Sequence, residues 1–119
     1  MNTTLIGRWG EELAAQYLKR KKYKIISMGY RCRYGEIDII AQCRKCIVFV
    51  EVKVRKNTDF GAGREFVNRW KIDKIRTTAK LWLSQNETDL QPRFDVIEIL
   101  APQGIHTVTP LINHLEDVF

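Results

Sequence analysis

Polar and apolar residues alternate along two neighbouring segments in the first half of the chain. The segment 35–41 reads GEIDIIA, and the segment 47–55 reads IVFVEVKVR. This two-residue period predicts two β-strands. Arg44 and Lys45 lie midway between the segments, and a turn centred on them would join the strands into an antiparallel hairpin. In that register, residues whose numbers sum to 89 would face each other.

The same register brings four charged side chains to one face of the hairpin. Asp38 would oppose Glu51, and Glu36 would oppose Lys53. Opposed side chains lie roughly 5 Å apart at Cβ, where like charges destabilise a sheet. A hard divalent ion with oxygen ligands, Mg²⁺ or Mn²⁺, would compensate the two carboxylates. The pattern therefore predicts a metal-dependent phosphodiesterase site, with Lys53 holding or activating a reactant. A register slip of one residue would separate the acids.

The first segment of the chain, residues 4–21, has the period of an amphipathic helix. Glu11 falls on the apolar side of this helix, where an acid is unusual. Two interpretations are open: Glu11 joins a functional site, or it is a helix-start carboxylate favoured by the helix dipole. The apolar side is formed by Ile6, Leu13, Ala14, Tyr17 and Leu18.

Residues 65–85 have the period of a second long helix. Trp70 and Trp82 are expected in the core. Arg69 belongs to a basic stripe on the opposite side of the helix. This stripe is either an ordinary solvated face or a contact for phosphates.

The remaining segments predict the fold class. A strand near residues 24–28 would precede the hairpin and complete an antiparallel three-stranded meander. Residues 93–100 form a fourth strand after the second helix, which suits a crossover connection and a mixed sheet. A short strand near 106–108 and a helical turn near 111–118 would follow. We expect one α/β domain over residues 1–119, with a central mixed sheet flanked by helices.

The chain is basic, with a net charge of +6 and a pI of about 9.4 over 119 residues. In a small domain this favours a polyanionic partner, chiefly nucleic acid, although charge also serves solubility alone. The N-terminal residues contain no apolar leader segment, and no apolar run approaches a membrane span. A cytoplasmic protein that does not insert into membranes is expected.

Three cysteines are present, and the odd number disfavours a disulfide framework. Cys43 and Cys46 form a C-x-x-C pair across the predicted turn, and Cys32 precedes them. A zinc site would need another ligand, but His106 and His114 lie far along the chain without zinc-like spacing. Reduced structural thiols are therefore favoured over zinc.

The charged residues of the hairpin also carry a resemblance. Residues 36–38 and 51–53, EID and EVK, resemble the PD-(D/E)xK nuclease signature, with EID in the place of PD. The chain as a whole resembles the YraN family over nearly its full length. The segments that carry this resemblance are 7–18, 30–38, 49–55, 93–96 and 113–119.

The YraN family is bacterial and similar to archaeal Holliday-junction resolvases, so the resemblance implies a restriction-endonuclease-like fold. It also implies that Asp38 and Glu51 are metal ligands, that Lys53 is the catalytic lysine, that Glu11 joins the site, and that Lys71 supports it. Because related resolvases cut two strands with paired sites, a homodimer is an expectation that follows from the family.

Two departures from the family pattern concern the surroundings of the site. Gly29 stands where family members commonly have Asn. The loop 61–66 lacks the usual Pro and the Ala-Glu-Ala run, although Glu65 matches. These differences affect the substrate-facing loop and leave the predicted metal site unchanged.

The main hypothesis is a metal-dependent endonuclease acting on DNA, including branched or junction DNA. Mg²⁺ or Mn²⁺ would be bound by Asp38, Glu51 and the carbonyl of Val52, with Lys53 and Glu11 completing the catalytic set. One alternative is a nucleic-acid-binding module without cleavage, and another is a scaffold in a repair or recombination assembly. Glu36 would support the site, and the predicted phosphate contacts are Arg33, Arg55, Arg69 and Lys71.

Overall fold

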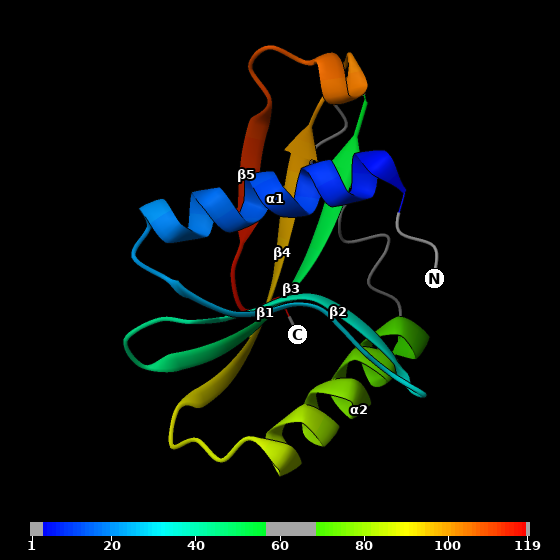
Figure 1. Cartoon of the computed structure of the whole chain (residues 1–119). Helices are drawn as coiled ribbons and strands as arrows, with labels where there is room; N and C mark the ends of the chain where they lie inside the picture. The colour runs from blue at the N-terminus through cyan, green and yellow to red at the C-terminus, as the bar shows by residue number, and fades with distance from the viewer. Residues whose placement is uncertain (1–3, 57–68, 119) are drawn as a thin grey trace.

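The computed structural model describes residues 4–56 and 69–118, and the structural statements below concern these residues. A five-stranded mixed sheet has one long helix on each of its two faces (Figure 1). The predicted α/β class and mixed sheet are confirmed. In chain order the elements are α1 Leu5–Arg20, β1 Lys24–Cys32, β2 Gly35–Gln42, β3 Cys46–Arg55, α2 Arg69–Gln85, β4 Gln91–Leu100, the 3₁₀ turn η2 Gly104–His106, and β5 Leu111–Leu115.

The strands lie in the sheet in the same order as in the chain. β1, β2 and β3 form the predicted antiparallel meander. β4 pairs with β3 in parallel, after a crossover that includes α2, and β5 closes the sheet as an antiparallel edge strand. The three interior strands, β2, β3 and β4, therefore have neighbours on both sides and carry the buried residues of the described sheet.

The predicted register of the β2–β3 hairpin is confirmed. Its paired positions run from Gln42↔Ile47 to Ile39↔Val50, and each pair sums to 89. Beyond these pairs, the backbone N–H of Cys43 donates to the carbonyl of Cys46 at 2.9 Å. The ladder pairs end at Ile39 and Val50, so the predicted pairings of Asp38 with Glu51 and of Glu36 with Lys53 are not among the pairs found for the described residues.

The face under α1 is a tightly packed apolar layer. Ala14 and Leu18 of α1 lie against Val48 and Val50 of β3. Gly10 allows this close approach, because a Cβ at that position would lie 2.5 Å from Cγ2 of Val54. A larger side chain would push the helix away from the sheet.

The face under α2 is built around an aromatic group. The Phe49 ring packs edge-on against Trp82, with centroids 5.9 Å apart, and stacks on Phe94 at 5.4 Å. The predicted core position of Trp82 is confirmed. The same prediction for Trp70 is wrong, because its side chain is 69% exposed at the start of α2.

The end of the chain differs from the prediction. Residues 106–108 are not a strand, and 111–115 form β5 in place of a helical turn. The cause is tertiary, since Leu111 to Leu115 pair with the open edge of β4, from Leu100 to Val96. Local periodicity does not report such a long-range partner. The part of the predicted second helix before residue 69 lies outside the described residues.

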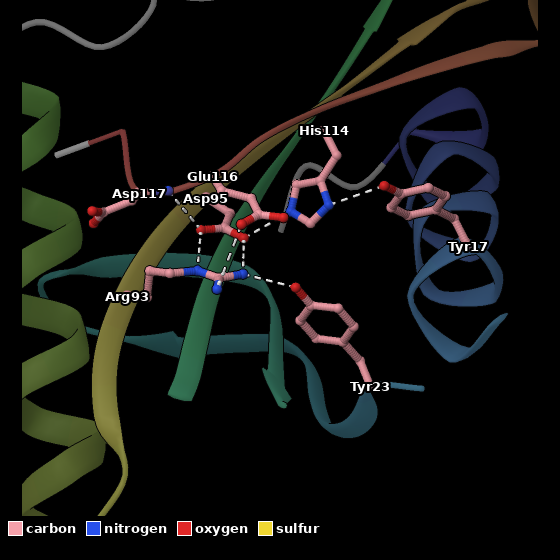
Figure 2. Close-up of polar contacts among 7 residues, drawn as sticks. All are labelled: Tyr17, Tyr23, Arg93, Asp95, His114, Glu116 and Asp117. Carbon is pink, nitrogen blue, oxygen red and sulfur yellow. Dashed lines mark hydrogen bonds and ion pairs between the residues drawn. The ribbon is translucent and has the colours of Figure 1, made fainter. Parts of the chain in front are cut away.

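Beneath α1, a polar network joins the end of the chain to the sheet (Figure 2). Asp95 of β4 is buried and lies at its centre. Arg93 donates to both carboxylate oxygens of Asp95, at 3.0 and 2.8 Å. His114 Nε2 lies 2.7 Å from the same carboxylate, and the backbone N–H of Asp117 donates to it at 3.0 Å.

The network extends to two tyrosines. Arg93 also donates to the Tyr23 hydroxyl at 2.8 Å, and the Tyr17 hydroxyl lies 3.1 Å from Nδ1 of His114 (Figure 2). Burial by itself would raise the pKa of Asp95, but the hydrogen bonds from His114 and Arg93 outweigh it and hold this pKa below its ordinary value. Each buried group is thus paired, and the network stabilises the fold.

Candidate functional site

The β2 strand changes its packing face at Asp38. Ile37 belongs to the apolar cluster under α2, whereas Ile39, two residues later, belongs to the cluster under α1. A regular strand would put both residues on one face. The Asp38 side chain accepts a hydrogen bond from the backbone N–H of Val52 at 2.8 Å. This bond holds the Asp38 carboxylate against β3 beside Glu51.

Four acids form one electrostatic group, which we term the carboxylate cluster: Glu11, Glu36, Asp38 and Glu51. The pKa of Asp38 is raised to about 8, first by burial and then by Glu51, with smaller contributions from Glu11 and Glu36. The Val52 hydrogen bond acts in the opposite direction and only partly offsets them. Burial and the neighbouring acids therefore both disfavour the charged form of Asp38.

Glu11 reaches the cluster from α1. The helix begins at Leu5, where the Thr4 side chain accepts from the backbone N–H of Gly7 at 3.0 Å. Glu11 thus lies beyond the first turn, where the effect of the dipole is small, so the helix-start interpretation does not account for it. Burial, Glu36 and Glu51 raise its pKa, in that order, against a smaller opposite effect of Arg8.

A cleft of about 520 Å³ opens beside the cluster, between the β1–β2 hairpin and α2. Glu36, Asp38 and Glu51 contribute its acidic lining. The remaining side chains are mostly cationic or aromatic, which is a composition suited to phosphate and base. They include Arg31, Arg33, Tyr34, Trp70, Lys71 and Lys74.

Two acids of the cluster have a cationic partner. Lys71 Nζ lies 2.8 Å from Oε2 of Glu51, and Arg31 Nε lies 3.4 Å from Oε2 of Glu36. These ion pairs join the acidic lining of the cleft to its basic rim. Lys71 and Glu36 are therefore placed beside the predicted ligands, and their supporting roles stay predictions.

The α2 side of the cleft adds two residues that the sequence analysis did not assign to the site. Trp70 and Lys74 both line it, and the Lys74 ammonium lies 4.5 Å from the centre of the Trp70 ring. Their spacing in the sequence could have indicated this, because Trp70 and Lys74 are four residues apart and therefore share a helix face. Lys71 and Ile75 lie beside them on the helix. An exposed tryptophan is suited to stack on a base.

Lys53 lies two residues beyond Glu51 on β3 and is half-buried opposite Glu98 of β4. Arg55 donates from Nε to Oε2 of Glu98 at 3.0 Å, and its side chain is only 12% exposed. The fully buried Glu98 also accepts from Asn113 at 3.0 Å. The phosphate contact of Arg55 stays a prediction, and this ion pair weighs against it. The catalytic role of Lys53 likewise stays a prediction.

The other predicted phosphate contacts lie at the surface. Arg33 lines the cleft and donates to the Tyr34 hydroxyl at 2.8 Å. Arg69 is the exposed first residue of α2 and lies outside the cleft lining found for the described residues. The loop 61–66, including Glu65, lies outside the described part of the chain. Gly29 has φ of 68°, a conformation that Gly and Asn both adopt readily, which explains why one replaces the other there.

The donor set of the cluster fits a hard divalent ion. Within residues 4–56 and 69–118, no group of three or more His, Cys, Asp or Glu side chains is arranged to hold a metal. Mg²⁺, however, is commonly bound by one or two carboxylates and keeps several water ligands. Asp38, Glu51 and the carbonyl of Val52 could supply such a partial set. Burial and then the charge of Glu51 raise the pKa of Asp38, and a cation bound between the two acids would relieve their repulsion.

Comparison with known proteins places this chain among close relatives. The model of a family described as "Uncharacterised protein family UPF0102" matches residues 10–99. A UPF0102 protein of Caldanaerobacter subterraneus subsp. tengcongensis is 41% identical over 100% of this chain and 98% of its own. A UPF0102 protein of Geotalea daltonii is 45% identical, over 99% of this chain and 91% of its own. Among the described residues, neither helix is long and apolar enough to span a membrane.

Proposed function

The chain belongs to the family UPF0102, the YraN family, and we propose that it is a metal-dependent DNA endonuclease. The names of its relatives state no activity, so the proposal rests on the site of this chain. The observation that carries the proposal is the half-buried Asp38 carboxylate held beside Glu51 in a cleft with a basic rim. Its substrates would be DNA phosphodiesters, and we extend this to branched or junction DNA.

Each part of the site has a role in this proposal. Asp38, Glu51 and the Val52 carbonyl would hold Mg²⁺ or Mn²⁺, which when bound polarises a phosphodiester and lowers the pKa of a water ligand. Lys53 would orient the attacking water and stabilise developing charge. Glu11 would hold a further water from the opposite helix. The cationic rim would position the phosphate.

A nucleic-acid-binding module without cleavage is the second candidate. The Lys71–Glu51 ion pair at 2.8 Å favours it, because the protein supplies its own cation to one predicted ligand. Asp38→Asn separates the two functions. In a nuclease this variant keeps DNA binding and loses cleavage, whereas in a pure binder the loss of one negative charge leaves binding unchanged or slightly stronger.

The deciding experiment is calorimetric titration with Mn²⁺. We expect about one ion per chain for the wild type and no measurable binding for Asp38→Asn, which keeps the side-chain oxygen that accepts from Val52. Glu12→Gln is the matched control, because this substitution also removes one negative charge, at an exposed position of α1 next to Glu11. No Mn²⁺ binding by the wild type, even with DNA present, would contradict the nuclease proposal.

Cleavage of junction, flap and duplex DNA is then measured with the same variants. We expect Mn²⁺-dependent products from the wild type and from Glu12→Gln, and at least a roughly 100-fold loss for Asp38→Asn. A homodimer is part of the proposal only for two-strand cutting. Sedimentation as a monomer at the working concentration would count against paired cuts by a stable dimer.

A further inference from the structure

A second pocket lies at the other end of the β2–β3 hairpin, and we term it the turn pocket. It has a volume of about 530 Å³ and is lined by residues that follow α1, by the hairpin turn and by the start of β4. The two thiols Cys43 and Cys46 contribute to its lining. The other side chains are all cationic: Lys21, Lys22, Arg44, Lys45 and Arg93.

Arg93 of the turn pocket is paired with Asp95, but the exposed cations of this pocket are compensated differently from those of the cleft. In the cleft, Lys71 and Arg31 are paired with acids of the carboxylate cluster. Within residues 4–56 and 69–118, the ion pairs involve neither Lys22 nor Arg44 nor Lys45, and all three are exposed. The described lining of the turn pocket contains no acid. Concentrated positive charge of this kind attracts a polyanion.

The backbone at Lys22 is a second, independent observation. Lys22 has φ of 73°, where the chain leaves α1 and Tyr23 N–H donates to the Leu18 carbonyl at 2.9 Å. This is the left-handed position after a helix that glycine normally occupies, and a side chain there is disfavoured by about 1 kcal/mol. Lys19 and Arg20 already supply cations to the last helical turn. The helix dipole therefore does not account for a further lysine in a strained position.

We propose that the turn pocket binds backbone phosphates of a nucleic-acid strand, at a contact separate from the cleft. Exposed ammonium and guanidinium groups are the usual donors to phosphate. The inference rests on the proposed function, because the same DNA would occupy the cleft. Cys43 directly follows the last residue of β2 and is five residues from Asp38, or about 17 Å at the rise of a strand. A strand that contacts both sites must therefore exceed about five nucleotides.

The test is anisotropy of a fluorescein-labelled single-stranded DNA of about 20 nucleotides, titrated in EDTA so that cleavage cannot contribute. We expect the double variant Arg44→Gln/Lys45→Gln to bind about 10-fold more weakly and to reduce the salt dependence of log K by about 1.4. The matched control is Arg76→Gln/Lys80→Gln, which removes two charges from exposed positions of α2 outside both pockets and should change affinity less than about 2-fold.

Lys22→Gly separates binding from folding. Glycine relieves the strained backbone, so the variant should melt at a higher temperature than the wild type while binding the DNA about 3-fold more weakly. A variant that is both more stable and a weaker binder has lost a contact, since misfolding would lower stability. Unchanged affinity with raised stability would instead assign Lys22 no role in binding and count against the proposal.

Three outcomes would overturn the inference. These are equal affinity of the turn variant and its control, no DNA binding by the wild type in EDTA, and displacement of DNA by polyglutamate as effective as displacement by unlabelled DNA. The last result would assign the pocket to an acidic protein segment. Failure of the nuclease proposal is seen separately, as absent Mn²⁺ binding and cleavage, and leaves the turn-variant result intact.

Discussion

Asp95 and Asp38 are two buried or nearly buried carboxylates on strands of one sheet, and their surroundings are opposite. Asp95 receives hydrogen bonds from Arg93, His114 and the backbone of Asp117 (Figure 2). The hydrogen bond found for Asp38 among the described residues comes from the backbone of Val52, and its charged neighbours are acids. The pKa of Asp95 is lowered, whereas that of Asp38 is raised to about 8.

The difference separates a structural centre from the proposed functional one. A carboxylate with its hydrogen bonds satisfied stabilises the fold and has little to offer a ligand. An acid held among other acids costs stability, and it persists at sites where a ligand supplies the missing charge. The same reasoning distinguishes Glu98, which is paired with Arg55 and Asn113, from Glu11, whose strongest charged neighbours are Glu36 and Glu51.

The largest effect is expected at the structural centre. Asp95→Ala should lower the free energy of unfolding by about 3–5 kcal/mol, because it leaves the half-buried Arg93 and the nearly buried His114 side chain without their shared carboxylate. Urea denaturation measures this change. Glu116→Gln is the control, because Glu116 is exposed and lies 3.7 Å from Arg93, so its loss should cost no more than about 1 kcal/mol. Equal effects of the two variants would contradict a central role for Asp95.

Substitution of Asp38 should instead stabilise the protein. The folded state binds the Asp38 proton more tightly than the unfolded state, whose pKa is near 3.8. The stability that this proton confers is complete below about pH 4 and is lost as pH rises to about 8. In EDTA, Asp38→Asn should therefore raise the melting temperature most at pH 8 and above, by roughly 4–8 °C per kcal/mol. A difference from the wild type that is the same at pH 4 and pH 8 would refute this account.

Glu11 offers a sharper and smaller test of the same centre. Glu11→Gln should weaken Mn²⁺ binding about 10-fold, because it removes one negative charge that faces Asp38 from α1. Glu12→Gln removes the same charge from the exposed side of the helix and should leave Mn²⁺ affinity within about 2-fold of the wild type. Calorimetry distinguishes them. Identical affinities would mean that only total charge matters.

Lys71→Gln should give the smallest effect on stability. The ion pair with Glu51 is partly exposed, so the free energy of unfolding should change by no more than about 1 kcal/mol. Mn²⁺ affinity should rise about 3-fold, because a competing cation is removed from Glu51. Lys80→Gln, on the exposed side of α2, is the control. Weaker Mn²⁺ binding by Lys71→Gln would show that Lys71 organises the site in place of competing for it.

Some features of the site could be read from the sequence because they are local. The alternation of residues 35–41 and 47–55 and the two-residue turn at Arg44 and Lys45 were sufficient for the hairpin register, which the structure confirms. The apolar period of the first helix likewise predicted the inward position of Glu11. Glycine at position 29 could be noted as a departure, but only its φ of 68° explained it.

Other features depended on partners far along the chain. The parallel pairing of β3 with β4 brings Glu98 beside Lys53, and this placement makes Arg55 a partner of a buried acid. The exposure of Trp70 depends on how α2 lies against β2, since both tryptophans fit a helix with an apolar side.

The sequence by itself determined the main sheet-forming segments and the register of the β2–β3 hairpin, because a turn and the strand period act over neighbouring residues. Only the tertiary structure decided which charges are compensated. Asp95 is paired with Arg93, two residues away in the sequence, and with His114 of β5. The pKa of Asp38, in contrast, is raised in part by the charge of Glu11 on α1. The energy of a charge depends on every group packed around it, and those groups are brought together by contacts that no local pattern records.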